Sequence, residues 1–272
     1  METTLTFASL DGTELVGTMH VPKGSSSYSA LMVHGLPSNR DEWGFYRDFA
    51  VALGEQGITS LRFDLRFNGD SAHGNFSGLT LGQLACDVEA AYRELVRQTT
   101  TAASPVVVGT SCGGGIAIRW ASSFRREANK LFLMAPVLDY VYEVAGLRAE
   151  SGEIPSPRFV SEVRNRAASG VKLNEEIGYG LPMLCDALTF DSVRELQCVR
   201  RSTTIFHGTA DSVVPFEISR RVSELVPSVQ LIPIAEADHG FAVKGDDDLT
   251  HPGTKANHQF IYQQVLLRLG DD

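Results

Sequence analysis

The sequence predicts an α/β fold with a mostly parallel central sheet, helices on both of its faces and a small inserted cap. From residue 30 onward, short apolar runs alternate with segments of helical period, which is typical of parallel β-α-β units. Several runs are apolar throughout, as expected of strands covered on both faces. The 272 residues are enough for one large domain whose core is stable without disulfides or metal.

The composition argues against several classes of protein. The formal net charge of −9 repels phosphate backbones and anionic lipid surfaces, which disfavours nucleic acid and membranes as partners. No run approaches the roughly 18 apolar residues of a membrane span, and the N-terminus lacks the features of a secretory signal. The four cysteines show no C-x-x-C spacing, which indicates buried or half-buried free thiols. We therefore expect a cytoplasmic protein without a metal.

Antiparallel strands are expected at the N-terminus, where residues 5–9 and 15–21 flank Asp11-Gly12, a hairpin turn signal. The later strands are expected at residues 30–34, 59–63, 105–109, 130–134, 203–207 and 230–234. Between them, Thr80 to Gln83 resembles a capping box and precedes a helical stripe formed by Leu84, Val88, Ala91 and Leu95. Further helices are expected at residues 42–53, 113–123, 216–225 and 258–268, the last starting at His258.

Residues 138–200 interrupt the alternation of strands and helices. The segment contains Gly-rich and Pro-rich patches, scattered charges and aromatic residues. It is too long for a plain loop between two core strands. We interpret it as a small, mainly helical cap, so that residues 1–137 and 201–272 form the α/β core.

The strongest functional signal is the pattern G-x-S-x-G from Gly109 to Gly113, directly after an apolar strand and directly before a helix. A nucleophile at such a sharp turn has strained backbone angles, so the residues two positions away must be small. The turn lifts Ser111 clear of the sheet, and the helix N-terminus favours developing negative charge. Cys112 is rejected as the nucleophile because Thr110, not glycine, stands two positions before it.

Two further segments supply an acid and a base. Asp211 follows a strand at its C-terminal end, where an orienting acid has to lie in a sheet of this kind. His239 follows the last strand, and a neutral imidazole is the best general base for a hydroxyl near pH 7. Asp238 competes with Asp211 for the orienting role. Because adjacent residues rarely direct their side chains at each other, we prefer Asp211.

A fourth signal, His34-Gly35-Leu36, again follows a strand. An acyl-transfer site needs two N–H donors that point at the oxyanion. The residue after the nucleophile supplies one donor and the loop after this early strand supplies the other, so we expect the backbone N–H groups of Cys112 and Leu36. His34 is expected to hold the loop through hydrogen bonds rather than to transfer protons or bind a metal.

With these residues in place, the chain resembles the α/β-hydrolase superfamily of serine hydrolases. The order of Ser111, Asp211 and His239 carries the resemblance, together with Asp64-Leu65-Arg66 and Gly69-Asp70-Ser71. Within the superfamily the chain is similar to small esterases and acyltransferases of the cinnamoyl and feruloyl esterase type. The resemblance implies the α/β-hydrolase fold and a reaction that needs no cofactor.

Two departures from the pattern of such enzymes stand out. Phe67 and Asn68 replace a common His-Gly or Gly-His pair, which we expect to alter the packing of that loop. Thr110 and Cys112 flank the serine where His and Met or Gln are usual, which we expect to reshape the acyl pocket. Neither departure removes Ser111 or its two partners.

The expected activity is hydrolysis of an ester or thioester of an apolar or aromatic acyl group through an acyl-enzyme. The substrate is expected to be a small molecule or an acyl group on a carrier, and the oligomeric state is left open. An acyltransferase, a thioesterase or an eliminating enzyme on the same triad stays open, whereas the intact triad argues against a non-catalytic ligand receptor. The acyl group is expected to contact cap residues Tyr140, Tyr179, Met183 and Leu184.

Overall fold

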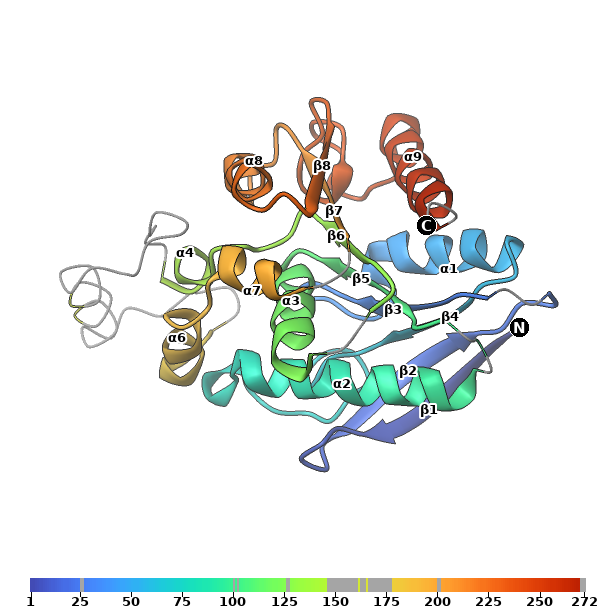
Figure 1. Ribbon diagram of the computed structural model, residues 1–272, viewed down its shortest axis with the longest axis horizontal. Helices are drawn as coiled ribbons and strands as arrows, with labels where there is room; N and C mark the ends of the chain where they lie inside the picture. The colour runs from blue at the N-terminus through green and yellow to red at the C-terminus, as the bar shows by residue number, and fades with distance from the viewer. Residues whose placement is uncertain are drawn as a thin grey trace.

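In a computed structural model of the chain, eight strands form one sheet in the order β1-β2-β4-β3-β5-β6-β7-β8 (Figure 1). β1 (Glu2–Ala8) and β2 (Glu14–His20) form the predicted hairpin, and β2 pairs antiparallel with β4. All other neighbouring strands are parallel, which confirms the predicted mostly parallel sheet. The structure describes residues 1–24, 27–99, 101, 103–125, 128–145, 161, 165, 178–199 and 202–269.

The parallel strands lie within one residue of their predicted bounds. Four of them, β3, β5, β6 and β7, are buried along their whole length, and the first three are almost entirely apolar in the sequence, as strands covered on both faces require. Because parallel strands end at the same edge of a sheet, the segments that follow β3, β5, β7 and β8 meet at one edge. The bounds are β3 (Ser29–Val33), β4 (Thr59–Phe63), β5 (Val106–Thr110), β6 (Leu131–Met134), β7 (Thr203–Gly208) and β8 (Val229–Ile234).

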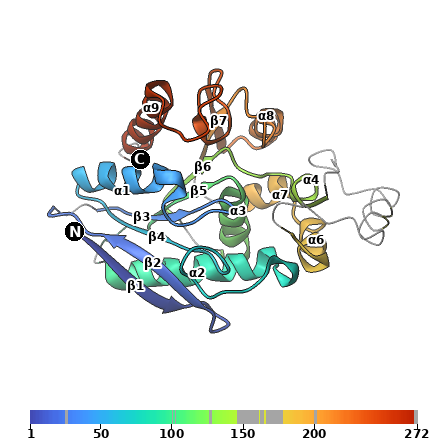
Figure 2. The same cartoon turned by 180° about the vertical axis from the view of Figure 1, so that it is seen from behind.

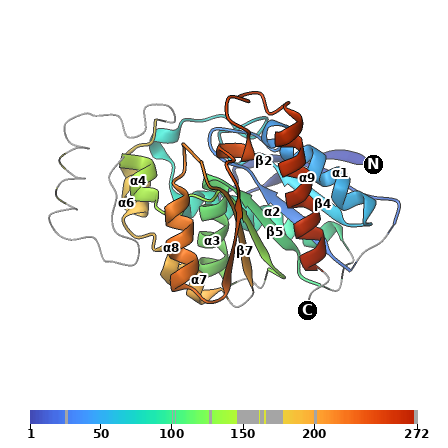
Figure 3. The same ribbon diagram turned by 90° about the horizontal axis from the view of Figure 1, so that it is seen from above.

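Helices cover both faces of the sheet, as Figure 3 shows from above. On one face lie α1 (Phe45–Glu55) and α9 (Pro252–Leu269), where the rings of Phe49 and Tyr262 stack at a centroid distance of 4.8 Å. The opposite face is covered by α2 (Leu81–Gln98), α3 (Cys112–Phe124) and α8 (Phe216–Leu225). This arrangement is the α/β-hydrolase fold that the sequence predicts.

The capping box at the start of α2 is present. Thr80 Oγ1 accepts a hydrogen bond from the Gln83 N–H at 3.0 Å, and the Thr80 N–H donates to Gln83 Oε1 at 3.0 Å. These two bonds satisfy backbone groups that the helix itself leaves unpaired. The stripe that follows is wholly buried, with Leu84, Val88, Ala91 and Leu95 at 0% exposure.

Two predicted helix starts are wrong. α9 begins at Pro252, so His258 lies inside the helix and not at its start. Proline is well tolerated in a first helical turn, but the Gly253 that follows it is a weak helix former and hides the start in the sequence. The helix expected from residue 42 instead begins at Phe45, after the short 3₁₀ turn η1 (Glu42–Gly44).

The segment between β6 and β7 contains α4 (Tyr140–Ala145), α6 (Leu181–Ala187) and α7 (Ser192–Cys198). These helices lie at the end of the molecule opposite the N-terminus (Figure 2). Their buried side chains join the same hydrophobic cluster as those of α2 and α3. Most of residues 146–177 lie outside the described part of the chain, so the division into core and cap stays a prediction.

The prediction of buried or half-buried thiols holds for Cys112 and Cys86 but is wrong for Cys185 and Cys198, which are exposed. The latter two lie on α6 and α7, where they face away from the buried sides of these short helices. Within the described ranges, none of the helices has the length and apolar character that a membrane crossing requires.

Candidate active site

Ser111 lies at the turn between β5 and α3 with φ 52° and ψ −123°. Non-glycine residues rarely adopt a positive φ, and such strain is concentrated at functional sites. Three backbone hydrogen bonds hold the turn: the Ser111 N–H donates to Met134 O at 2.8 Å, and Ser111 O accepts from Gly114 and Val137 at 3.0 and 2.9 Å. Ser111 is half-buried, so the side chain is partly accessible to solvent.

The glycine at 113 lets α3 approach the end of β3. A Cβ on Gly113 would lie 2.2 Å from the Val33 carbonyl oxygen and 2.4 Å from that of His34. Neither contact can be relieved by a side-chain rotation, because both oxygens belong to the backbone. The requirement for small neighbours of Ser111 therefore comes from close packing between the turn and the adjacent strand.

We expect Gly113→Ala to lower the free energy of unfolding by about 1–3 kcal/mol, because the added methyl group overpacks a closed backbone contact. Gly78→Ala is a matched control, since a Cβ at Gly78 meets nothing within 4 Å. It should change the stability by less than about 0.5 kcal/mol. Denaturant unfolding of both variants measures the difference, and equal stabilities would contradict the packing argument.

Asp211 and His239 are brought together from the loops after β7 and β8. His239 Nδ1 lies 2.8 Å from Asp211 Oδ2, the distance of a hydrogen bond in which the imidazole donates. The other carboxylate oxygen, Asp211 Oδ1, accepts the N–H groups of Val213 and Val214 at 2.9 and 2.8 Å. Asp211 is therefore fixed by its own loop and presents one oxygen to the histidine.

The charges of this pair follow from their surroundings. Burial raises the pKa of Asp211, but hydrogen bonds from His207 and His239 lower it more, so the carboxyl titrates well below its usual range. Burial lowers the pKa of His239, but the hydrogen bond and charge of Asp211, with the nearby Glu42 and Asp238 carboxyls, raise it more. The net pKa of His239 is therefore above its ordinary value.

Asp238, the competing acid, contacts other groups. Its Oδ1 accepts the Ser212 N–H at 2.8 Å, the Ser212 hydroxyl at 2.7 Å and the backbone N–H of His239 at 2.7 Å. These bonds hold the turn that carries His239 but do not reach its ring. Of the two acids, Asp211 contacts the imidazole ring and Asp238 contacts the backbone of His239, so the orienting role of Asp211 stays a prediction.

His207, which the sequence analysis did not single out, contacts the Asp211 carboxylate. It is fully buried, and its Nε2 lies 3.3 Å from Asp211 Oδ2 and 3.0 Å from Val214 O, while its Nδ1 lies 2.7 Å from Ser219 Oγ. The sequence signal that could have indicated His207 is its position at the end of an apolar strand, four residues before Asp211.

The loop that carries Leu36 lies against the first residue of α3, Cys112. The Leu36 N–H contacts the thiol of Cys112, and Cys112 is the first residue of α3, where backbone N–H groups have no partner within the helix. Burial raises the pKa of the Cys112 thiol well above its ordinary value, so this sulfur is not a thiolate nucleophile. The role of the Cys112 backbone N–H as an oxyanion donor stays a prediction.

His34 has the surroundings expected of a structural histidine. It is fully buried, with Nδ1 2.6 Å from Gly35 O and Nε2 accepting the Leu65 N–H at 2.9 Å. Burial lowers the pKa of His34 to about 4, so the ring is neutral at pH 7. It links the loop after β3 to the loop after β4.

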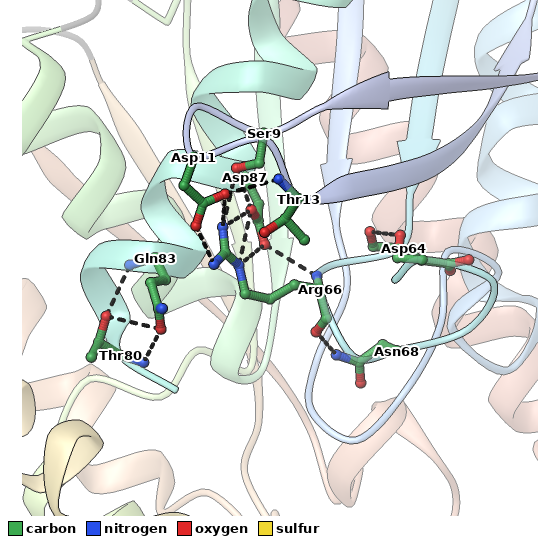
Figure 4. Close-up of polar contacts among 10 residues, drawn as sticks. Ser9, Asp11, Thr13, Asp64, Arg66, Asn68, Thr80, Gln83 and Asp87 are labelled. Carbon is green, nitrogen blue, oxygen red and sulfur yellow. Dashed lines mark hydrogen bonds and ion pairs between the residues drawn. The ribbon is translucent and has the colours of Figure 1, made fainter. Parts of the chain in front are cut away.

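The Asp64-Leu65-Arg66 segment fixes the loop after β4. Asp64 Oδ1 accepts the Arg40 N–H at 2.6 Å, and its Oδ2 accepts the Asp70 N–H at 2.9 Å. The buried Arg66 guanidinium lies between Asp87 of α2 and Asp11 of the N-terminal hairpin (Figure 4). Asp64 therefore ties the loop that carries Leu36 to its neighbour, whereas Arg66 anchors that neighbour to the rest of the fold.

Thr110 does not face an acyl pocket. Its hydroxyl donates to Tyr46 Oη at 2.6 Å, and Tyr46 donates in turn to Val33 O at 2.9 Å. Both side chains are buried, so this departure from the family pattern is a contact between β5 and α1. The expected effect of Thr110 on the acyl pocket is not supported by its position.

The four predicted acyl-binding residues are buried near Cys112. Tyr140 Oη donates to Cys112 O at 2.5 Å, and Tyr179 Oη lies 3.9 Å from Cys112 Sγ. Met183 and Leu184 belong to the same hydrophobic cluster. All four are packed side chains that are at most 4% exposed. The printed contacts bring Tyr140 and Tyr179 to Cys112, the residue after Ser111, and contact of any of the four with a substrate stays a prediction.

A cavity of about 490 Å³ opens between the loops that follow β3 and β4. Its wall includes Phe67 and Asn68, the second departure from the family pattern, and Trp43, which is 74% exposed. Pro37 and Ser38, next to the predicted oxyanion donor Leu36, also line it. In the described ranges, no three His, Cys, Asp or Glu side chains are grouped to hold a metal ion.

Comparisons with known proteins agree with this fold. A model of the alpha/beta hydrolase family matches residues 30–249. The chain is 23% identical over 237 residues to the AB hydrolase superfamily protein YisY of Bacillus subtilis, covering 77% of this chain and 84% of that protein. It is 27% identical over 155 residues to 2-hydroxy-6-oxo-2,4-heptadienoate hydrolase of Pseudomonas putida, covering 49% of this chain and 56% of that protein.

Solved structures show the same architecture. Est1E from Butyrivibrio proteoclasticus, with ferulic acid bound, superposes with a TM-score of 0.71 at 20% identity, over 96% of this chain and 99% of that one. Alpha/beta hydrolase domain-containing protein 10 from mouse has a TM-score of 0.71 at 17% identity, over 99% of both chains. At these identities the likeness establishes the fold alone.

Proposed function

Because this chain belongs to the alpha/beta hydrolase family and its relatives support a hydrolase, we propose that it is a serine hydrolase acting on an ester or thioester of an apolar or aromatic acyl group. Ser111 is the nucleophile, His239 the base and Asp211 the acid that orients the base. One observation carries the proposal: the strained Ser111 turn shares the sheet edge with a 2.8 Å hydrogen bond between His239 Nδ1 and Asp211.

The proposed reaction has two steps. His239 Nε2 takes the proton of Ser111 Oγ as this oxygen attacks the carbonyl carbon, and the backbone N–H groups of Leu36 and Cys112 donate to the oxyanion. When the intermediate collapses, the leaving group takes the proton from His239 and the acyl group stays on Ser111. Water, deprotonated by His239, then attacks the acyl-enzyme, and as the bond to Ser111 Oγ breaks, His239 returns the proton to this oxygen and the acid is released. Asp211 stays ionised throughout and keeps Nδ1 protonated.

The apolar or aromatic acyl group is supported by the side chains around the site. Tyr140 and Tyr179 contact Cys112, the residue after the nucleophile. The rings of Phe67 and Phe76 line the cavity beside the oxyanion loop, with centroids 6.4 Å apart. A methylene in an apolar pocket is worth at most about 1–3 kcal/mol, so selectivity among acyl chains should be graded.

Covalent labelling tests the proposal directly. A fluorophosphonate should add to Ser111 and to no other residue, because in the proposed site this hydroxyl has a base and oxyanion donors at hand. Intact mass should rise by one adduct, and peptide mapping should locate it. Label on Cys112, or no label on the folded protein, would refute the serine hydrolase. A series of p-nitrophenyl esters of increasing acyl length would then define the acyl preference.

A further inference from the structure

Glu42 places a carboxyl group inside the proposed active site, although neither the G-x-S-x-G pattern nor the triad includes it. Its Oε2 accepts the backbone N–H of Gly35 at 2.8 Å. A Cβ built on Gly35 would lie 3.1 Å from Ser111 Cβ and 3.4 Å from Glu42 Oε1. Ser111 and the Glu42 carboxyl therefore both lie close to Gly35, in the loop that continues into the proposed oxyanion donor Leu36.

The backbone around Glu42 is strained in a way that aims this side chain. Glu42 and Trp43 have φ values of 45° and 54°, and Gly44 has 92°. Left-handed angles cost free energy for residues with a Cβ and persist only where the surroundings impose them. Trp43 is exposed and gains no burial from this turn, whereas Glu42 is directed inward. The strained turn therefore directs the Glu42 carboxyl toward the Gly35 N–H.

The groups that face the Glu42 carboxyl come from several elements. They are the Gly35 N–H and the Ser38 hydroxyl of its own loop, Tyr46 of α1, Cys112 of α3 and His239 after β8. Of these groups only His239 becomes positively charged when it takes up a proton. The ring of His239 also faces Asp211 and Asp238, so Glu42 adds a third acidic group to its surroundings.

We propose that Glu42 is a positioning residue of the site, which holds the oxyanion loop through Gly35 and places a negative charge beside His239 to stabilise the imidazolium formed during acyl transfer. This inference rests on the proposed function. Glu42 acts through the loop and through the base and touches no reacting atom. Asp211 fixes the tautomer of the ring from the Nδ1 side, whereas Glu42 contributes charge and loop geometry.

The Glu42 carboxyl titrates near neutral pH. Burial raises the pKa of Glu42 to about 7, against the lowering effects of the Gly35 N–H and of His239. Below that pH the carboxyl gains a proton and no longer stabilises the imidazolium. The charged form favours protonated His239, so removing the charge should lower the pKa of His239 and move the acidic limb of the rate profile to lower pH.

Two variants separate the two roles. In Glu42→Gln the amide oxygen still accepts from Gly35 and the amide N–H₂ can donate to Ser38, so only the charge is removed. We expect its acidic limb to move to lower pH, with the rate on the plateau kept within about threefold. Glu42→Ala also removes the acceptor of Gly35, and misplacing an oxyanion donor should lower the rate by about 10–10²-fold at every pH.

The readout is the second-order rate constant for fluorophosphonate labelling of Ser111, measured from about pH 5 to 9, the range in which histidine titrates. Glu55→Gln, at the exposed end of α1, removes one negative charge away from the site and should match the wild type. If Glu42→Gln has the wild-type pH profile, the electrostatic role is wrong. If folded Glu42→Ala labels at the wild-type rate, the loop-holding role is wrong.

The proposed hydrolase function and the proposed role of Glu42 are refuted by different results. A folded wild-type protein that is not labelled on Ser111 would overturn the proposed function before any Glu42 variant is compared. Wild-type labelling with unchanged Glu42 variants would overturn only the role of Glu42. Should Glu42→Ala fail to fold, as circular dichroism would show, Glu42→Gln still decides the electrostatic role, because it keeps the hydrogen bond to Gly35.

Discussion

Replacing Ser111 with alanine is expected to lower kcat by about four to six orders of magnitude, because the nucleophile of a triad acts as a unit with its base and acid. Alanine keeps the Cβ, so the strained backbone at φ 52° and the packing around the turn are unchanged. The variant should therefore fold normally and lose fluorophosphonate labelling. Hydrolysis of a short p-nitrophenyl ester measures the loss, and thermal unfolding verifies the fold.

Ser122→Ala provides the control for this experiment. Ser122 lies on the same helix, α3, and its hydroxyl donates to Glu195 and to the Arg119 carbonyl, away from the turn. Its removal should leave kcat within about twofold of the wild type. If Ser111→Ala kept activity within tenfold of the wild type, the hydrolysis would have to come from another residue, and the assignment of the nucleophile would be wrong.

Asp211→Asn is expected to lower the rate by about 10³–10⁴-fold while the protein stays folded. A carboxylate accepts the Nδ1–H of His239, whereas an asparagine amide can present its N–H₂ group to the ring and favour the tautomer that cannot accept the serine proton. Asp238→Asn is the matched control, because Asp238 contacts the backbone of His239 and Ser212 but not the imidazole. It should cost less than about tenfold, and the opposite ranking would reverse the assignment.

The same variant has a signature in stability. The folded-state pKa of Asp211 is lower than that of the unfolded chain, so its ionised form stabilises the fold above the unfolded value of 3.8. This contribution is lost as the pH falls through the lower, folded pKa. Asp211→Asn should thus be less stable than the wild type at pH 7, with a difference that shrinks in strong acid. Denaturant unfolding at several pH values measures it.

The sheet could be predicted closely because its strands are buried on both faces. Burial on both faces leaves short runs that are apolar throughout, and the strand at 59–63 was placed to the residue. Helix ends were less predictable, since they depend on single residues. Pro252 and Gly253 open α9 but are also typical of loops, so the sequence alone favoured a later start.

Ser111, Asp211 and His239 could be proposed from the sequence because the chemistry of a triad fixes both residue type and order along the chain. Glu42 could not, because its place in the site depends on three consecutive positive φ values that only tertiary contacts impose. The buried position of Tyr140 and Tyr179 was equally hidden, since an aromatic residue in the sequence is compatible with a ligand pocket and with a packed core. In the sequence His207 is not distinguishable from other residues of its strand, and only the folded structure brings its ring beside Asp211.

The residues of the proposed site lie far apart in the sequence. Leu36, Ser111, Asp211 and His239 follow four different strands, and they meet only because β3, β5, β7 and β8 run parallel in one sheet. Contacts between distant segments form slowly, since the entropy of closing long loops is lost before they become favourable. A partly assembled sheet could bury its apolar strands before His239 is positioned near Ser111. If Ser111 is the nucleophile proposed above, the recovery of its labelling during refolding marks the completed topology and should come later than the return of helical structure.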